Sequence, residues 1–166
     1  MIGIKVKIGE VSKAHGVRGQ MKIKSEFERK DLIKEGMNVS INGYNHKLLH
    51  YNYKTGKDFD LMQVEGINSI DEVLANKNAD IMVFRDDLHL NDQDILYQDL
   101  YNMDVYLNDK KIGCVIDVTG DKNVLIVIDN NKYIPYKGDF IKNIDREKGI
   151  IYLNDSSEAL LWELVF

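Results

Sequence analysis

The residues best suited to binding chemistry lie in one short segment near the N-terminus, His15-Gly16-Val17-Arg18-Gly19. Its two glycines allow a tight turn, and Arg18 offers five N–H donors in a planar fork that suits a phosphate or a guanine edge. With its neighbours, the segment predicts an RNA- or anion-binding surface made of Lys13, His15, Gly16, Arg18, Gly19, Lys22 and Lys24. A glycine-rich hairpin turn with solvated charges is the alternative, and residue types alone leave both open.

Residues that could support catalysis or bind a metal are few. His46 and His50 lie four residues apart on an expected strand, so at ~3.3 Å per residue they are roughly 13 Å apart and cannot share a metal. Cys114 lies in an apolar run, where burial is expected rather than a reactive thiolate. Asp92 and Asp94 resemble the start of a calcium loop, but the glycine and the distal glutamate of such a loop do not follow. We therefore predict a protein that is not an enzyme and has no metal and no cofactor.

The charge of the chain is unevenly distributed. The whole chain has 22 basic and 27 acidic residues, for a net charge of −5, which argues against a general polyanion binder. Six of the basic residues and one of the acidic residues fall within residues 1–24, so the rest of the chain carries 16 basic and 26 acidic residues. Contact with RNA is therefore expected to begin at the N-terminal end.

The composition indicates a packed, cytoplasmic protein. Hydrophobic residues at 44% and charged residues at 30% are ordinary for a globular chain. The single cysteine excludes an internal disulfide and fits a reducing compartment. The N-terminus alternates apolar and charged residues, unlike a signal peptide, and no apolar run approaches the ~20 residues of a membrane helix. We expect a cytoplasmic location and no contact with a membrane.

Hydrophobic periodicity predicts two small β domains, of which the first is a small barrel or a sandwich. Period-two patterns and turn signals indicate strands at 2–8, 21–24, 39–41, 44–53, 59–64 and 81–84, with an Asn42-Gly43 hairpin turn. Ser69 and Glu72 have the spacing of a capping box, which predicts a short helix that plugs one end of the first barrel. The pattern of strands and turns continues in the second domain, with strands expected at 103–107, 112–118, 124–128, 132–136, 140–144 and 150–153. A last helix is expected from Ser156.

Three stretches of the sequence together match the pattern of a known family. The first runs from Ile8 to Ile23 and contains the His15–Gly19 loop between two strands. The second is Val64-Glu65-Gly66-Ile67 with Asp71-Glu72, and the third is Ile134-Pro135-Tyr136 with Phe140 to Asp145. With Asp99-Leu100 and Gly113, these stretches resemble the RimM family of ribosome maturation factors, and the resemblance covers nearly the whole chain.

The resemblance implies an all-β fold of two small antiparallel β-barrels with short helices. The expected domains are a translation-factor-like barrel at 1–88 and a PRC barrel at 95–166, joined by a linker at 89–94. It also implies a non-catalytic, monomeric assembly factor that binds the immature small (30S-type) ribosomal subunit and promotes maturation and processing of its rRNA. The expected protein partner is ribosomal protein number nineteen, in the head of that subunit.

The expected partner-binding segment departs from the family pattern. The family usually has two aromatic residues shortly before the position of Asp99-Leu100, and this chain has Ile95 and Leu96 there, followed by Tyr97. The resemblance nevertheless assigns partner-protein binding to Ile95, Leu96, Tyr97, Asp99 and Leu100. Packing of Ile95, Leu96 and Tyr97 at the domain junction is the alternative.

Two other classes of protein remain open on the sequence. One is a protein-interaction module that uses a PRC barrel in a complex unrelated to ribosomes. The other is a hydrolase or transferase, which only scattered carboxylates and histidines favour.

Overall fold

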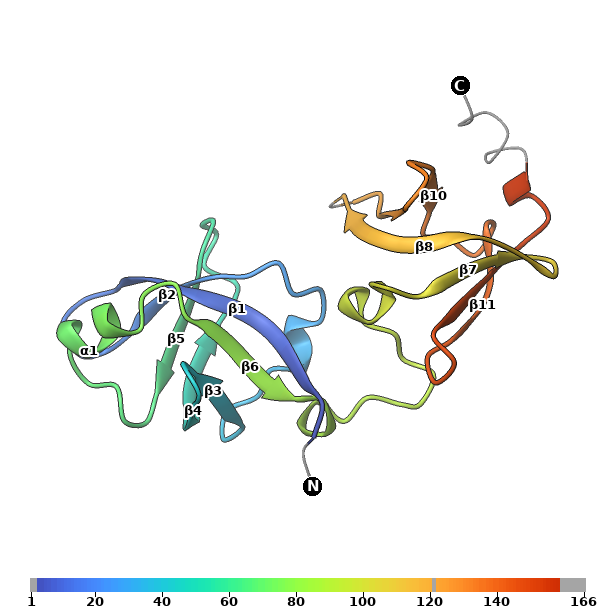
Figure 1. Ribbon diagram of the computed structural model, residues 1–166. Helices are drawn as coiled ribbons and strands as arrows, with labels where there is room; N and C mark the ends of the chain where they lie inside the picture. The colour runs from blue at the N-terminus through green and yellow to red at the C-terminus, as the bar shows by residue number, and fades with distance from the viewer. Residues whose placement is uncertain (1–2, 121, 159–166) are drawn as a thin grey trace. The chain divides into compact units, whose positions relative to one another are not determined.

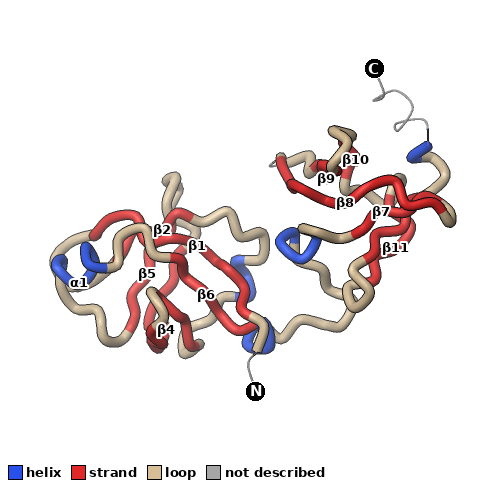
Figure 2. Tube along the Cα trace, in the orientation of Figure 1, coloured by secondary structure: helices blue, strands red, loops and turns tan. Residues whose placement is uncertain are grey.

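The computed structural model describes residues 3–120 and 122–158. The chain divides into two compact units, Met1–Asp94 and Ile95–Phe166. Strands are the main regular structure of both units, and the helical segments are short (Figures 1 and 2). The predicted all-β class is therefore confirmed. No helix among the described residues has the length and apolar character needed to cross a membrane.

The first unit is a closed six-stranded barrel with the hydrogen-bonded order β1-β2-β5-β4-β3-β6. Its strands are β1 (Lys5–Ala14), β2 (Met21–Lys24), β3 (Asn38–Ile41), β4 (Tyr44–Asn52), β5 (Asp60–Val64) and β6 (Asp80–Phe84). The barrel closes because β6 pairs antiparallel with both β1 and β3, as expected for a closing strand.

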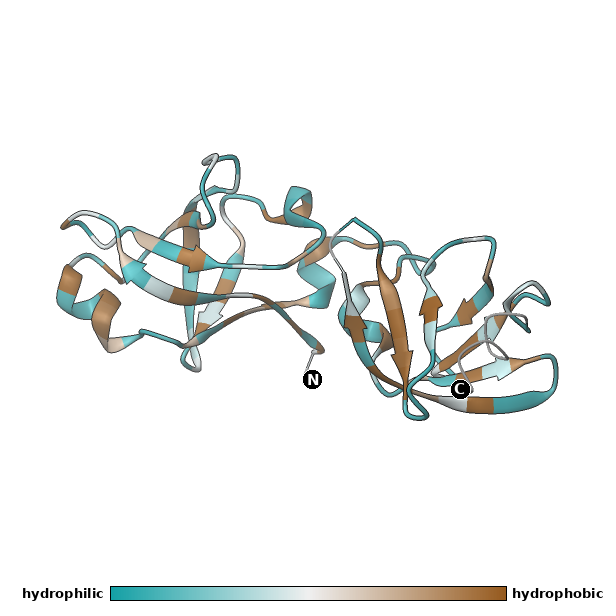
Figure 3. Ribbon diagram, turned by 90° about the horizontal axis from the view of Figure 1, so that it is seen from above, coloured by the Kyte–Doolittle hydropathy of each residue, from teal (hydrophilic) through white to brown (hydrophobic). Residues whose placement is uncertain are grey.

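Period-two alternation packs the barrel. Met21 and Ile23 of β2 are fully buried, whereas Lys22 is half-buried and Lys24 is exposed. Apolar bands lie mainly along the strands, and the connecting loops are mostly hydrophilic (Figure 3). The first strand was expected from residue 2, but it begins at Lys5, and Ile4 is exposed. It continues to Ala14 because its first half pairs with β6 and its second half with β2.

Two local predictions are confirmed. Asn42 and Gly43 have φ values of 54° and 84°, the left-handed pair that a type I′ hairpin turn requires, and they join β3 to β4. Helix α1 (Ile70–Ala75) is capped by Ser69, whose Oγ accepts a hydrogen bond from the Glu72 amide at 3.2 Å. Val73 anchors α1, which lies at one end of the barrel (Figure 1).

The second unit is a six-stranded sheet with the order β10-β9-β8-β7-β12-β11. Its strands are β7 (Asp104–Leu107), β8 (Lys110–Thr119), β9 (Leu125–Ile128), β10 (Tyr133–Pro135), β11 (Ile141–Asp145) and β12 (Ile150–Leu153). The pairing departs from a purely antiparallel sheet because β12 runs parallel to β7, with Ile151 beside Val105. β8 occupies one edge of β7, and β12 returns along the other edge, where it buries Ile151 and Leu153.

Three short 3₁₀ turns complete the described residues: η1 (Lys30–Leu32), η2 (Arg85–Leu88) and η3 (Tyr97–Leu100). In η2, Arg85 and Leu88 are buried. Arg85 Nη2 donates to the Asp94 carbonyl at 3.1 Å, so the end of the polar segment after β6 is tied to its start in the first unit. The predicted last helix carries Leu160, Leu161 and Trp162, which lie outside the described residues.

Candidate nucleic-acid interface

The glycine loop joins β1 to β2 and is fixed at both ends. The His15 amide donates to the Gln20 carbonyl at 2.8 Å, which closes the base of the loop. Gly19 has a φ of 91° and is buried, and a Cβ atom there would lie 2.1 Å from the Ile67 carbonyl oxygen. Gly16 also has a positive φ of 79°, but a Cβ there would meet open space. The loop therefore needs Gly19 for close packing against the segment before α1, whereas Gly16 serves the turn alone.

The predicted cations gather on the paired strands β1 and β2 and their loop. Lys13 lies directly opposite Lys22, and Glu10 lies opposite Lys24. Lys13, Arg18 and Lys24 are exposed. The Glu10 carboxylate is ion-paired with Lys7 at 2.7 Å. Across residues 3–120 and 122–158, no ion pair engages the basic surface, which we define as Lys13, Arg18, Lys22 and Lys24. These four cations are therefore available to an anionic ligand.

The structure adds the aromatic residue Phe59 to the candidate site. From the sequence, Phe59 is identified only as the first residue of an expected strand. Lys22 Nζ lies over the Phe59 ring, 4.6 Å from its centroid. The His15 and Phe59 ring centroids are 6.4 Å apart, with an interplanar angle of 43°. The pairing of β2 with β5 brings these residues together, with Ile23 beside Asp60. No local sequence signal reports that pairing.

A buried polar network lies next to Phe59 along the chain. Asp60 is buried, and its Oδ2 accepts a hydrogen bond from Tyr51 Oη at 2.5 Å. The same oxygen forms an ion pair with Lys30 Nζ at 2.8 Å. Burial, followed by the hydrogen bond to Asp60, raises the pKa of Tyr51 well above its usual value near 10. The network leaves the Asp60 carboxylate compensated inside the barrel, so it fixes the start of β5.

The predicted partner-binding segment is largely packed into the second unit. Leu96 and Leu100 are buried. Leu100 belongs to the hydrophobic core of the second unit, and Ile95 packs against that core. Asp99 Oδ2 accepts a hydrogen bond from the Leu96 amide at 2.8 Å, which caps η3. The Tyr97 ring is half-buried and stands edge-on to the Tyr136 ring, with the centroids 5.7 Å apart. Of the five residues, Leu100 is enclosed in that core, so it offers no surface to a partner while the unit stays folded.

The two histidines and the cysteine each have their own local surroundings. His46 Nδ1 lies 2.9 Å from the Glu65 carbonyl, and His50 Nδ1 lies 2.8 Å from Glu35 Oε1. Cys114 is half-buried, less than the burial expected from its apolar run. Within the described part of the chain, no group of three His, Cys, Asp or Glu side chains is placed to hold a metal ion.

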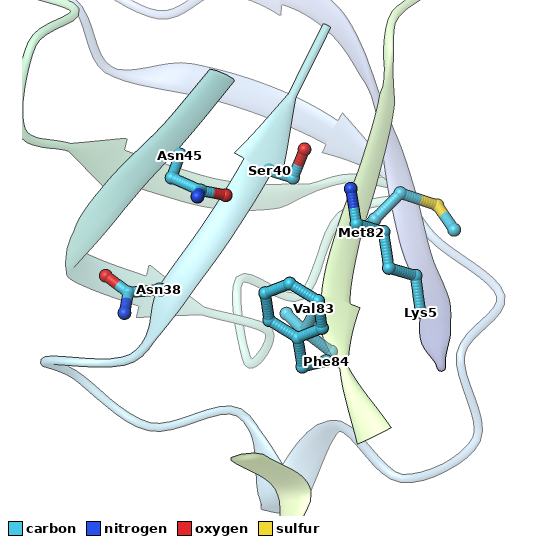
Figure 4. Close-up of a pocket in the computed structure, with 7 residues that line it drawn as sticks. All are labelled: Lys5, Asn38, Ser40, Asn45, Met82, Val83 and Phe84. Carbon is cyan, nitrogen blue, oxygen red and sulfur yellow. The ribbon is translucent and has the colours of Figure 1, made fainter. Parts of the chain in front are cut away.

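A small hollow lies between β3 and β6 (Figure 4). Its lining offers one ammonium group and no carboxylate, imidazole or thiol, and consists of Lys5, Asn38, Ser40, Asn45, Met82, Val83 and Phe84. Lys5 Nζ lies 5.6 Å from the centroid of the Phe84 ring. These side chains provide no nucleophile paired with a base.

Both units match known protein families. Residues 6–88 match the RimM N-terminal domain, and residues 92–160 match the PRC-barrel domain. Relatives named ribosome maturation factor RimM include one from Staphylococcus haemolyticus, 32% identical over 157 residues that cover 89% of this chain and 94% of the relative. Another, from Staphylococcus saprophyticus, is 31% identical over 154 residues that cover 87% and 92% of the two chains.

A solved structure of a RimM-type 16S ribosomal RNA processing protein from Pseudomonas aeruginosa is 17% identical, with a TM-score of 0.44. That match covers 93% of this chain and 99% of the other. A closed barrel with a basic hairpin, followed by a second β-sheet unit, defines a two-domain protein with a RimM N-terminal domain and a PRC barrel. The chain belongs to the ribosome maturation factor RimM family.

Proposed function

We propose that this chain is a non-catalytic maturation factor that binds the immature small ribosomal subunit and promotes processing of its rRNA. Membership of the RimM family supports the role in ribosome maturation. The observation that carries the RNA contact is the basic surface, whose four cations have no ion-pair partner among the described residues. Such cations contribute affinity by replacing the counterions of phosphates.

In this proposal the barrel at 1–88 contacts RNA. Lys13, Arg18, Lys22 and Lys24 neutralise phosphates and His15 adds a polar ring at the loop, while Gly16 and Gly19 shape the backbone that presents them. The positive balance of residues 1–24 in an otherwise acidic chain supports this orientation. The protein acts in the cytoplasm as a monomer, without a metal or cofactor.

The unit at 95–166 contacts ribosomal protein number nineteen of the subunit head, and residues 89–94 link the two domains. An acidic surface would complement a basic ribosomal protein and speed its association. Tyr97 is half-buried and presents a ring edge of the segment, while Leu100 lies in the core, Ile95 packs against that core and Asp99 caps the turn.

Co-sedimentation with purified immature small subunits in a sucrose gradient tests the RNA-binding role. The unmodified chain should move with the particles at low salt. A triple variant, Lys13→Ala with Lys22→Ala and Lys24→Ala, should remain at the top of the gradient. The matched control replaces Lys47, Lys77 and Lys122, three exposed lysines elsewhere, and so changes the net charge equally. Equal losses for the two triple variants would contradict a specific surface.

A pull-down with ribosomal protein number nineteen tests the second contact in the full chain. Tyr97→Ala should reduce retention of that protein, whereas Tyr133→Ala, at an exposed tyrosine of the same unit, should not. Retention that is unchanged in Tyr97→Ala would remove this segment from the interface and leave the RNA contact untouched.

A further inference from the structure

One outward face of the barrel combines lysines with an aromatic ring. On β2, Met21 and Ile23 point into the core, so Lys22 and Lys24 point outward. On the paired strand β5, Asp60 and Met62 are buried, so alternation places Phe59 on the same outward face as Lys22. Lys22 and Phe59 are diagonal neighbours across the two strands, which explains the 4.6 Å approach of Nζ to the ring centroid.

Phe59 is held in place by its surroundings. Thr55 Oγ1 donates to the Phe59 carbonyl at 2.7 Å, which closes the turn between β4 and β5. On its other side, Asp60 is anchored by Tyr51 and Lys30. A ring that is ordered before a ligand arrives loses little conformational entropy when it binds. The half-buried Phe59 is therefore a rigid platform rather than a loose surface side chain.

We propose that this platform binds single-stranded RNA, with one unpaired nucleobase stacked on Phe59 and beside His15, and the adjoining phosphates held by Lys22 and Lys13. This inference rests on the proposed function and names the chemical form of RNA that the barrel recognises. A nucleotide carries a flat π-system and an anion within one residue, which matches an aromatic ring flanked by unpaired ammonium groups. An acidic peptide would use the lysines but leave the ring without a stacking partner.

The form of the RNA follows from access to its bases. In a duplex the faces of the bases are covered by their neighbours, so an aromatic side chain meets only unpaired loops, bulges or ends. On binding, the base would take the ring face that Lys22 Nζ now covers, and the ammonium group would move to the phosphate. The His15 ring, tilted by 43° at 6.4 Å, borders the same space.

Fluorescence anisotropy with a short labelled single-stranded RNA of mixed sequence, titrated with the full chain, tests the platform. Phe59→Leu should weaken binding about tenfold, because stacking on an aromatic ring contributes on the order of that factor per base. Its salt slope should stay unchanged, since no phosphate contact is lost. Phe59→Trp should bind as tightly as the unmodified chain or more tightly. Tyr44→Leu, which removes an exposed aromatic ring elsewhere on the barrel, should have no effect.

Lys22→Ala separates stacking from charge. It should weaken binding and reduce the magnitude of the salt slope by about 0.7, the loss of one phosphate contact on a single strand. A duplex of the same sequence should bind Phe59→Leu and the unmodified chain equally. If Phe59→Leu binds the single strand as tightly as the unmodified chain while Lys22→Ala does not, stacking is wrong and the proposed function stands. If Phe59→Leu instead fails to retain ribosomal protein number nineteen in the pull-down, the ring is a protein contact and the inference fails.

Discussion

The two segments assigned to binding, 13–24 in the barrel and 95–100 in the second unit, are built in opposite ways. In the first, the charged side chains are mostly exposed and the residue that packs is Gly19. In the second, Leu96 and Leu100 are buried, and the carboxylate of Asp99 accepts a backbone hydrogen bond. Segment 13–24 therefore has a rigid backbone that presents its side chains to solvent. In segment 95–100 the side chains instead hold the backbone in place.

The difference shows why a family signature is an uneven guide to contact residues. The fold itself requires a glycine that packs against a carbonyl, and it requires a leucine that fills a core. Members of a family are therefore expected to keep either residue whether or not it touches a partner. Solvent-facing cations that the fold does not pair are different, because folding gains little from them. The contrast can be tested by comparing the effect of each residue on stability with its effect on binding.

The largest effect on stability is expected from Leu100→Ala. Leu100 is completely buried, so its truncation should lower the free energy of unfolding of the second unit by about 2–5 kcal/mol. Arg18→Ala, at an exposed position, should change stability by less than about 0.5 kcal/mol. Urea denaturation followed by circular dichroism measures both. A loss below about 1 kcal/mol for Leu100→Ala would mean that the segment is not core and is open to a partner.

The next effect is expected at the loop. Gly19→Ala combines a left-handed φ with a Cβ that would overlap the Ile67 carbonyl, so it should destabilise the barrel by about 3 kcal/mol. Gly16→Ala has the same φ problem but open space, and should cost about 1 kcal/mol. Thermal denaturation of the two variants gives the comparison. Equal losses would show that the packing of Gly19 against the segment before α1 is unimportant.

A third prediction concerns the network beside Phe59. The folded state raises the pKa of Tyr51 through burial and its bond to Asp60, so the tyrosine resists deprotonation when folded. Its contribution to stability is complete below the unfolded pKa near 10, and above pH 10 it falls by about 1.4 kcal/mol per pH unit. Stability should therefore drop less steeply from pH 10 to 11 in Tyr51→Phe than in the unmodified chain. Parallel slopes would contradict the buried hydrogen bond.

The sequence predicts short-range features of the fold, but it does not predict which distant strands pair with one another. Asn42-Gly43 and Ser69 act within a few residues, and both predictions are confirmed. The parallel pairing of β12 with β7 and the meeting of Phe59 with Lys22 depend on which strands become neighbours. Period-two patterns reveal which side chains share a face of one strand but not which strand lies beside it.

The same limit applies to the candidate site. The cluster of cations around Arg18 is visible in the sequence because its members are close along the chain. The sequence could not choose between contact and packing for Ile95 and Leu96, because an apolar residue next to a polar linker suits both. The core of the folded second unit favours packing for Ile95, which lies against it.

The smallest expected effect is the most informative about the basic surface. Lys13 and Lys22 face each other directly across β1 and β2, and like charges in that arrangement oppose strand pairing. Lys13→Gln removes the charge and keeps most of the aliphatic side chain, so it should raise the free energy of unfolding by about 0.2–0.5 kcal/mol at low salt. The gain should disappear in high salt, where the repulsion is screened.

Lys47→Gln is the control because Lys47 pairs with the neutral Asn38. Denaturation and RNA titration of the same samples should show Lys13→Gln folding more stably and binding more weakly, whereas equal stability changes in the two variants would contradict the repulsion. A lysine pair that opposes folding but strengthens RNA binding would be explained by the ligand and not by the fold.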